Sequence, residues 1–205
     1  MTPRRWLNVA LGATIGILGA FLLIRLTAGP PPDGATEGQG AFLPQPYPAP
    51  RLDLTDTRGD SVHLSDFRGR AVAVFFGYTH CPDVCPVTLA RISRSLQALG
   101  DDGARIQVLF VTVDPARDTA AAMARYLEAF DPSIVGLVGS EEDLRPQATA
   151  WGVGFQRRGT GDDYVVDHTA RVFLIDGRGR IVGLLSSSAN AEETEAALRR
   201  LVEMS

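Results

Sequence analysis

The stretch AVAVFFGYTHCPDVCPVTL, residues 71–89, decides the fold of this 205-residue chain. Its first six residues form a continuous apolar run, which is typical of a β-strand that is buried on both faces. From Val87 onward apolar residues recur at roughly helical spacing, which predicts an α-helix after Cys85. A buried strand that runs directly into a helix indicates an α/β fold, and two cysteines occupy the junction between them.

The same two patterns alternate along the rest of the chain. Single segments are predicted as strands at Ile106–Val113 and Ile134–Val138 and as helices at Thr119–Phe130, Glu141–Trp151 and Ala191–Met204. Hairpins are predicted for Leu52–Leu54 with Val62–Leu64 and for Arg171–Ile175 with Ile181–Leu185. This order implies a central mixed sheet with helices on both faces. A cysteine pair between the first buried strand and its helix suggests a thioredoxin-like fold, with its active groups at the carboxyl end of the strand.

The N-terminal region is predicted to anchor the protein in a membrane. Residues 7–24 contain no charged residue and as a helix would span about 27 Å, close to the roughly 30 Å of a hydrocarbon core. Arg4 and Arg5 precede this run, which places the N-terminus in the cytoplasm and the rest of the chain outside. We therefore expect a single-pass anchor at residues 1–28. A cleaved signal peptide is the alternative, and it would export the domain equally.

A proline- and glycine-rich segment follows the anchor. Seven prolines fall within residues 29–50, and such a composition cannot build a hydrophobic core. We expect residues 29–45 to be a linker and residues 46–205 to be the thioredoxin-like domain. The linker would hold the domain off the membrane while leaving it free to move.

Composition excludes several classes of function. The formal net charge is −4, and acidic residues outnumber arginines beyond the N-terminal segment, so binding to nucleic acid is not expected. The chain contains no lysine, which excludes a lysine nucleophile or a Schiff base. Its only two cysteines, Cys81 and Cys85, are too few for a disulfide framework and point to a metal or redox pair. The alternative is that they are simply small buried hydrophobic residues.

The spacing of the two cysteines suits thiolate chemistry. In or near the first turn of a helix, an i, i+4 pair places both sulfur atoms on one face, about 5–6 Å apart at Cβ. Unpaired N–H groups and the positive end of the helix dipole stabilise thiolates there, and thiolate is the form that binds metals and attacks disulfides. Pro82 and Pro86 fit a loop that enters a helix. The spacing alone leaves both a metal site and a redox pair open.

A histidine supplies a third candidate ligand. His168 lies just before the predicted strand at residues 171–175, in a loop that faces the cysteines in a thioredoxin architecture. Thioredoxin-type oxidoreductases usually carry a proline there, and this chain has none. Two thiolates and one imidazole form a soft set that suits Cu(I) and, with an added ligand, tolerates Cu(II). Structural zinc normally takes four ligands, so zinc is the weaker hypothesis.

Other residues near these motifs receive structural interpretations. The side chain of His80 should point away from Cys81, and His63 should be a surface strand residue. Asp83 should stabilise the helix start, with tuning of the thiolate or of copper as the functional alternative. A turn and helix cap are predicted for Asp114, Pro115 and Asp118. A polar loop, not a nucleotide site, is predicted around Gly152, Gly154, Gly159 and Gly161.

Three motifs together resemble the Sco/SenC family of copper-binding proteins. They are YTHCPDVCP at residues 78–86, VTVDPARDT at residues 111–119 and DHT at residues 167–169, and the resemblance covers roughly residue 46 to the C-terminus. The resemblance implies that Cys81, Cys85 and His168 bind copper and that the protein helps to assemble the CuA site of cytochrome c oxidase. Family members are credited with delivering copper, with reducing the target's cysteines, or with both.

Two classes of function therefore stand side by side. The first is a metallochaperone, whose partners would be the oxidase subunit that carries CuA and another copper chaperone or thiol reductase. The second is an extracytoplasmic thiol–disulfide oxidoreductase that uses Cys81 and Cys85. The residue that separates them is His168, because copper binding needs it and dithiol exchange does not. A peroxidase is a distant third hypothesis, since no peroxidatic cysteine is apparent.

Overall fold

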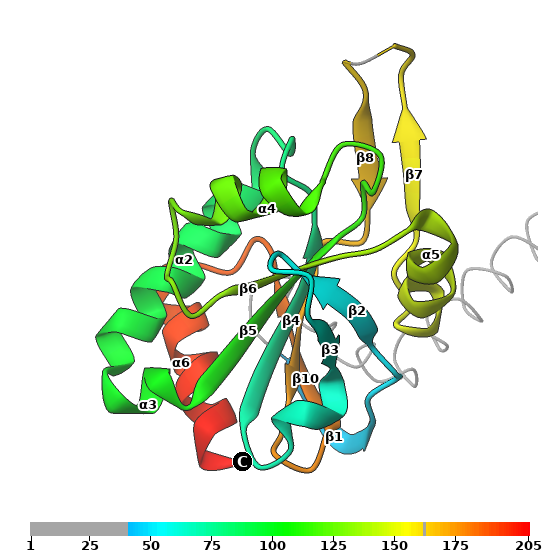
Figure 1. Ribbon diagram of the computed structural model, residues 1–205. Coiled ribbons are helices and arrows are strands. Elements are labelled where there is room, and N and C mark those ends of the chain that lie inside the picture. The colour runs from blue at the N-terminus through cyan, green and yellow to red at the C-terminus, as the bar shows by residue number, and fades with distance from the viewer. Residues whose placement is uncertain (1–40, 162) are drawn as a thin grey trace, which may run out of the picture. The chain divides into compact units, whose positions relative to one another are not determined.

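A computed structural model describes residues 41–161 and 163–205 of the chain. In this part an eight-stranded sheet has the order β1-β10-β9-β4-β5-β6-β2-β3 (Figure 1). Its strands are β1 (Ala41–Pro48), β2 (Asp53–Asp56), β3 (Ser61–His63), β4 (Ala71–Gly77), β5 (Ile106–Thr112), β6 (Val135–Val138), β9 (Arg171–Ile175) and β10 (Arg180–Ser186). A separate two-stranded sheet pairs β7 (Phe155–Arg158) with β8 (Val165–His168). The helices are the 3-10 helix η1 (Leu64–Phe67) and the α-helices α2 (Val84–Leu99), α3 (Asp101–Ala104), α4 (Ala120–Leu127), α5 (Glu141–Ala150) and α6 (Ala191–Glu203).

The sheet is mixed, as the alternation of strands and helices predicts. Strands β4, β5 and β6 run parallel, and all other neighbours in the sheet pair antiparallel. Figure 1 shows α2 and α6 on one side of the sheet and α5 on the other. Each predicted strand and helix is present, with ends that differ by a few residues; α4, for example, ends at Leu127 and not at Phe130.

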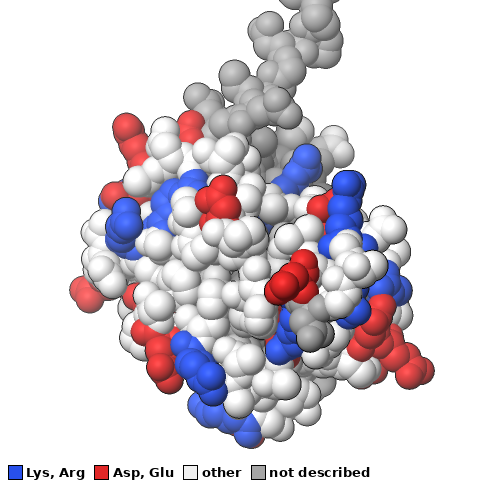
Figure 2. All heavy atoms as spheres, turned by 90° about the horizontal axis from the view of Figure 1, so that it is seen from above, with Lys and Arg blue, Asp and Glu red and all other residues white. Residues whose placement is uncertain are grey.

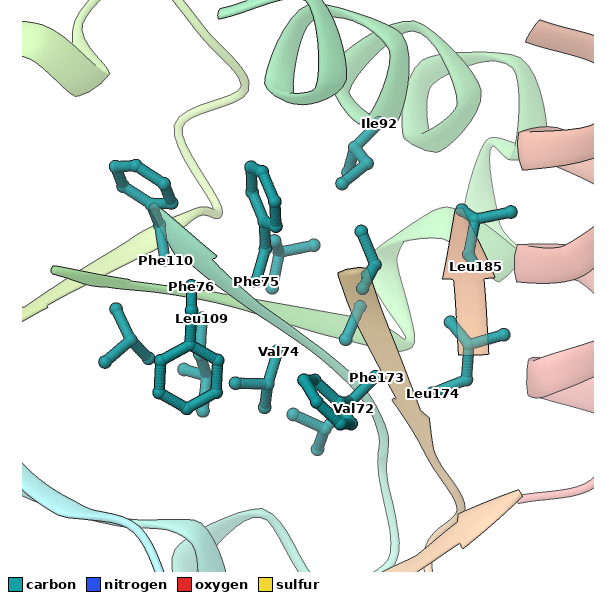
Figure 3. Packing of buried hydrophobic residues seen from close by; sticks show 14 of the residues in the cluster. Val72, Val74, Phe75, Phe76, Ile92, Leu109, Phe110, Phe173, Leu174 and Leu185 are labelled. Atoms are coloured by element: carbon teal, nitrogen blue, oxygen red, sulfur yellow. The ribbon is translucent and has the colours of Figure 1, made fainter. Parts of the chain in front are cut away.

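The central strand β4 is apolar along its whole length because both of its faces are covered. All seven of its residues are buried. Phe75 points to the side where Ile92 of α2 lies, together with Phe110 of β5, and Phe76 points to the opposite side with Phe173 (Figure 3). Successive side chains of a strand alternate between faces, so a strand between two helical layers needs apolar residues at every position.

One end of the sheet gathers the segments that carry the sequence motifs. β4 ends at Gly77 and continues through residues 78–83 into α2, while the neighbouring parallel strand β5 ends at Thr112. The β7–β8 hairpin projects from the same end of the molecule (Figure 1). The carboxyl ends of parallel strands meet at one edge, which is where an open α/β sheet places its functional groups.

The linker predicted for residues 29–45 is wrong from Ala41 onward. Residues 41–48 form strand β1, which pairs antiparallel with β10 at the edge of the sheet. Phe42 and Leu43 pack against the hydrophobic core, and an edge strand tolerates prolines because one row of its N–H groups faces away from the sheet. The linker was predicted from the high proline and glycine content of the segment, and this average gave no weight to Phe42 and Leu43. The described fold therefore begins before Pro46, the predicted start of the domain.

The polar loop predicted around four glycines is only partly correct, because the glycines lie outside any strand but the residues between Gly154 and Gly159 form β7 of the β7–β8 hairpin. The strands pair from Phe155 with His168 to Arg158 with Val165. The last three residues of β7 are exposed and polar, so the segment lacks the apolar alternation that marks a half-buried strand. Gly159 and Gly161 have positive φ angles of 105° and 74° near the tip, where the chain reverses.

Residues 1–40 lie outside the described part of the chain. The anchor predicted for residues 1–28 and most of the predicted linker fall there. Among the described residues, no helix is both long and apolar enough to cross a bilayer.

Candidate metal centre

Gly77, which has no side chain, ends β4 and makes room for the helix that carries Cys85. A Cβ atom at position 77 would lie 2.8 Å from Sγ of Cys85 and 2.6 Å from Cε2 of Phe110. Real Cβ atoms do not approach other atoms so closely, so only glycine lets the first turn of α2 pack here. Cys85 is accordingly fully buried, and Pro86 lies in the same turn, as the sequence predicts.

The two cysteines form a coupled pair of free thiols. Cys81 is partly exposed, and its Sγ accepts a hydrogen bond from the backbone N–H of Cys85 at 3.4 Å. The thiol hydrogen bond from Cys85 lowers the pKa of Cys81 to about 5, aided by the backbone N–H groups of Cys85 and Asp83. The same thiol hydrogen bond, together with burial, raises the pKa of Cys85. At neutral pH, Cys81 is therefore a thiolate and Cys85 is the thiol that donates to it.

His168 presents a lone pair with no partner. It lies at the end of β8, and its Nδ1 is 3.2 Å from the carbonyl oxygen of Val166. Because a carbonyl oxygen only accepts, Nδ1 carries the proton and Nε2 carries the lone pair. Nε2 is buried and makes no hydrogen bond to any described residue. A buried polar atom without a partner is costly, and a histidine held in this way through Nδ1 is typical of a metal ligand.

The three predicted ligands lie in one region but do not form a closed set in this structure. Cys81 and Cys85 share a hydrogen bond, and the ring of His168 packs against the ring of Tyr78, which lies three residues before Cys81. Within residues 41–161 and 163–205, no three His, Cys, Asp or Glu side chains stand together closely enough to hold a metal ion. Coordination by all three residues therefore stays a prediction, and it needs His168 to approach the sulfur atoms.

Tyr78 connects the cysteine loop to the strand that carries His168. Its backbone carbonyl accepts a hydrogen bond from the N–H of Cys81 at 3.3 Å, and its hydroxyl accepts one from the N–H of Val166 at 3.2 Å. Its ring packs edge-on against the ring of His168, with centroids 5.7 Å apart and an interplanar angle of 82°. This role of Tyr78 was not predicted from the sequence, although Tyr78 opens one of the three motifs.

Asp118 fixes the loop before the cysteines through buried hydrogen bonds. This fully buried carboxylate accepts hydrogen bonds from the backbone N–H of Thr79 at 3.1 Å, from its hydroxyl at 2.6 Å and from the hydroxyl of Thr112 at 2.7 Å. Burial raises the pKa of Asp118. The predicted turn at Asp114 is present, since its carbonyl accepts from the N–H of Asp118 at 3.0 Å. The cap of α4, however, is Thr119, whose side chain accepts from the backbone of the helix, and not Asp118.

The remaining predicted residues lie around this centre in structural roles. His80 is exposed, with Nδ1 2.9 Å from the hydroxyl of Thr79. His63 is an exposed residue of β3 whose Nδ1 lies 2.7 Å from a carboxylate oxygen of Asp53, which confirms its prediction as a surface strand residue. Asp83 is the N-cap residue of α2, but its side chain makes no capping hydrogen bond.

Figure 2 shows this end of the molecule from above. Uncharged groups cover much of the face, and acidic and basic side chains are interspersed toward its margins. A cavity of about 700 Å³ lies beside the start of α2, and the exposed apolar residues Val84 and Val87 line it. Exposed apolar side chains beside a reactive pair are suited to contact with another protein.

Comparison with known proteins relates the chain to one family. The family model described as SCO1/SenC matches residues 45–203. The mitochondrial SCO2 homolog of Bos taurus is 36% identical over 170 residues, which are 81% of this chain and 60% of the bovine protein. The chain thus spans less than two thirds of the length of that relative.

Solved structures show the same likeness. The copper-bound ScoI of Bradyrhizobium japonicum has a TM-score of 0.69 at 39% identity, covering 76% of this chain and 99% of that protein. The apo Sco1 of Thermus thermophilus has a TM-score of 0.68 at 39% identity, covering 83% of this chain and 98% of that protein. These similarities confirm the predicted thioredoxin-like α/β fold with its central mixed sheet.

Proposed function

This chain belongs to the SCO1/SenC family, and from that premise we propose that it is a copper-binding protein that assists the assembly of cytochrome c oxidase. The observation that carries the proposal is the lone pair on Nε2 of His168, which is buried without a partner among the described residues and lies near a thiolate. Copper-bound structures of similar proteins support copper as the cargo.

We propose Cys81, Cys85 and His168 as the ligands of that cargo. Two sulfur atoms and one imidazole nitrogen are soft donors, the kind that favour copper over hard cations. At neutral pH, Cys81 is already a thiolate, whereas Cys85 still carries its proton. Binding through both sulfur atoms therefore releases the proton of Cys85, and the affinity for copper falls as the pH falls.

The same pair of thiols supports a second candidate function, reduction of the cysteines of the target. The Cys81 thiolate would attack a disulfide of the target, form a mixed disulfide and release one target thiolate. Cys85, after losing its proton, would attack the sulfur of Cys81, release the second target thiolate and leave a Cys81–Cys85 disulfide. Two electrons pass to the target, so the oxidised protein needs an external thiol reductant. The low pKa of Cys81 favours this reaction as much as it favours copper binding.

The proposed setting is the outer side of a membrane. Residues 1–28 would form a single-pass anchor with a cytoplasmic N-terminus, and the segment from residue 29 to the start of β1 would be the tether. A tether raises the effective concentration of the domain near a membrane-bound target without a large interface. The proposed partners are the oxidase subunit that carries CuA and another copper chaperone or thiol reductase.

Replacement of the histidine separates the two functions. His168→Ala should keep both thiols and still form the Cys81–Cys85 disulfide, but it should lose copper affinity because only two ligands remain. Cells that carry this variant should show low oxidase activity at limiting copper, partly rescued by added copper. His80→Ala, which removes an exposed histidine beside Cys81, is the matched control. Normal oxidase activity with His168→Ala at low copper would defeat copper delivery and favour thiol reduction.

A further inference from the structure

The β7–β8 hairpin carries His168 but is not part of the main sheet. Its two strands pair only with each other, as a separate sheet within the described chain (Figure 1). An isolated two-stranded hairpin is at best marginally stable in water, so contacts at its base must fix its position. The buried residues of this segment are Tyr164 and Val166. The position of His168 therefore depends on what holds these two residues.

Tyr164 is held by two charged residues of the loop after β5. Its hydroxyl donates to Oδ1 of Asp114 at 2.6 Å. Nε of Arg117 donates to Oδ2 of the same carboxylate at 2.5 Å, and its Nη1 donates to the backbone carbonyl of Tyr164 at 3.0 Å. The guanidinium also stacks on the ring of Tyr164, with Cζ 3.6 Å from the centroid. Asp114 and Arg117 together therefore bind both the side chain and the backbone of Tyr164.

The charges in this cluster are withdrawn from water. The side chains of Asp114 and Arg117 are only 3% and 17% exposed, and Tyr164 is buried. An ion pair in such a place stabilises its surroundings only when hydrogen bonds satisfy the remaining atoms, and here they run to Tyr164. A helix cap does not account for the burial of Asp114, because Thr119 caps α4.

Contacts continue from this cluster to the candidate metal centre. Arg117 also lies 5.9 Å from the ring centroid of Tyr78. The hydroxyl of Tyr78 accepts from the N–H of Val166, and the carbonyl of Val166 accepts from Nδ1 of His168. Tyr164 immediately precedes β8, and His168 ends it. Fixing one end of this short strand therefore fixes the imidazole at the other.

We propose that Asp114, Arg117 and Tyr164 form a clamp that positions the β7–β8 hairpin and so sets where His168 stands relative to the cysteine pair. These are positioning residues, since none of them supplies a ligand. The clamp rests on the proposed function, because it presumes that His168 serves the same centre as Cys81 and Cys85. Its loss should leave the thiols in place and loosen only the histidine.

The test variant is Tyr164→Phe in the full-length protein, because it removes one hydroxyl and keeps the ring. Loss of a hydrogen bond to a carboxylate should raise amide hydrogen exchange of the β7–β8 hairpin about tenfold, while exchange in β4 and β5 stays unchanged. The affinity for Cu(I), measured by competition with a chromophoric chelator, should fall by a similar factor. The alkylation rate of Cys81 should not change. Tyr47→Phe, an exposed tyrosine of β1, is the matched control and should behave as wild type.

A double-mutant cycle separates a clamp from general destabilisation. If Asp114 and Tyr164 act together, Asp114→Asn combined with Tyr164→Phe should loosen the hairpin by less than the product of the two single effects. Independent effects that multiply would overturn the clamp. Hairpin exchange unchanged by Tyr164→Phe would overturn it too, and so would faster exchange with an unchanged affinity for Cu(I).

Failure of the proposed function gives a different result. In that case His168→Ala binds Cu(I) as tightly as wild type, while hydrogen exchange of the copper-free protein still reports on the hairpin contacts of Tyr164. The inference is supported only when His168→Ala and Tyr164→Phe both weaken copper binding and Tyr164→Phe also loosens the hairpin.

Discussion

Cys81 and Cys85 have the same side chain but differ in exposure and in proton affinity. Cys85 is fully buried in the first turn of α2, whereas Cys81 lies in the loop before it and is partly exposed. The hydrogen bond between the two thiols lowers the pKa of one and raises that of the other. Cys81 is therefore the partly exposed nucleophile of the pair, and Cys85 is the buried thiol that keeps its proton.

The first residue-scale prediction concerns the pH dependence of alkylation. The rate at Cys81 follows its thiolate fraction, so it should rise through pH about 5 and level off above that value, while Cys85 stays unmodified. Cys85→Ala removes the donating thiol and should move the midpoint for Cys81 to higher pH. Mass spectrometry after short pulses of iodoacetamide measures the alkylation of each cysteine at each pH, in the wild type and in the variant. In denaturant the two cysteines should titrate alike near pH 8.5, and a native Cys81 with that midpoint would contradict the prediction.

The second residue-scale prediction concerns Gly77. Gly77→Ala places a methyl group 2.8 Å from Sγ of Cys85, so the helix turn must shift. We expect a loss of about 1–3 kcal/mol in the free energy of unfolding, measured in urea, and faster alkylation of Cys85. Gly154→Ala is the control, because its Cβ would meet nothing within 4 Å. Equal stability of the two variants would show that α2 has room to spare.

The sequence was enough to predict the candidate ligands, but not the residues that hold those ligands in position. The cysteine spacing and a histidine before a strand are visible in one dimension, because their residue types are rare and chemically specific. Tyr78, Asp118 and Tyr164 act through partners distant in the chain, such as Asp118 with Thr79 and Tyr164 with Asp114. No local pattern encodes such pairs, although all of them except Tyr164 lie inside the three motifs.

At the scale of elements, predictability follows burial. β4 and β5 were predictable because strands covered on both faces require continuous apolar runs. β1 and the β7–β8 hairpin were not, because each is largely exposed and carries prolines or polar residues. An edge strand is defined mainly by the neighbour it pairs with, and for β1 that neighbour is β10, near the other end of the chain.

The prediction at this scale tests whether β1 is a structural part of the sheet. Phe42 is partly buried against the core and lies under Arg200 of α6, whose Cζ is 4.2 Å from the ring centroid. Phe42→Ala should lower the free energy of unfolding by about 1–2 kcal/mol, since it removes a half-buried aromatic ring. Tyr47→Ala, on the exposed part of the same strand, should cost less than about 0.5 kcal/mol. Urea unfolding curves measure the loss of stability in each variant. Equal losses for Phe42→Ala and Tyr47→Ala would mean that β1 does not anchor the sheet.

At the scale of the whole molecule, the prediction concerns topology. If the N-terminus is cytoplasmic, a membrane-impermeant maleimide should label the partly exposed Cys81 in intact cells whose outer membrane has been permeabilised. Cys81→Ser should abolish this labelling, which identifies the site. Labelling only after lysis would place the domain on the cytoplasmic side and would contradict the proposed orientation.

The order of the strands also has a consequence for when the protein can fold. β1 pairs only with β10 among the described strands, and the central strand β4 needs β9 on one side, so both wait for the last part of the chain. Ribosomes add about 5–20 residues per second, so β1 emerges on the order of ten seconds before its partner. Through that interval the sheet cannot close. If the proposed topology holds and the chain crosses the membrane unfolded, this strand order keeps the sheet open until β10 has been made.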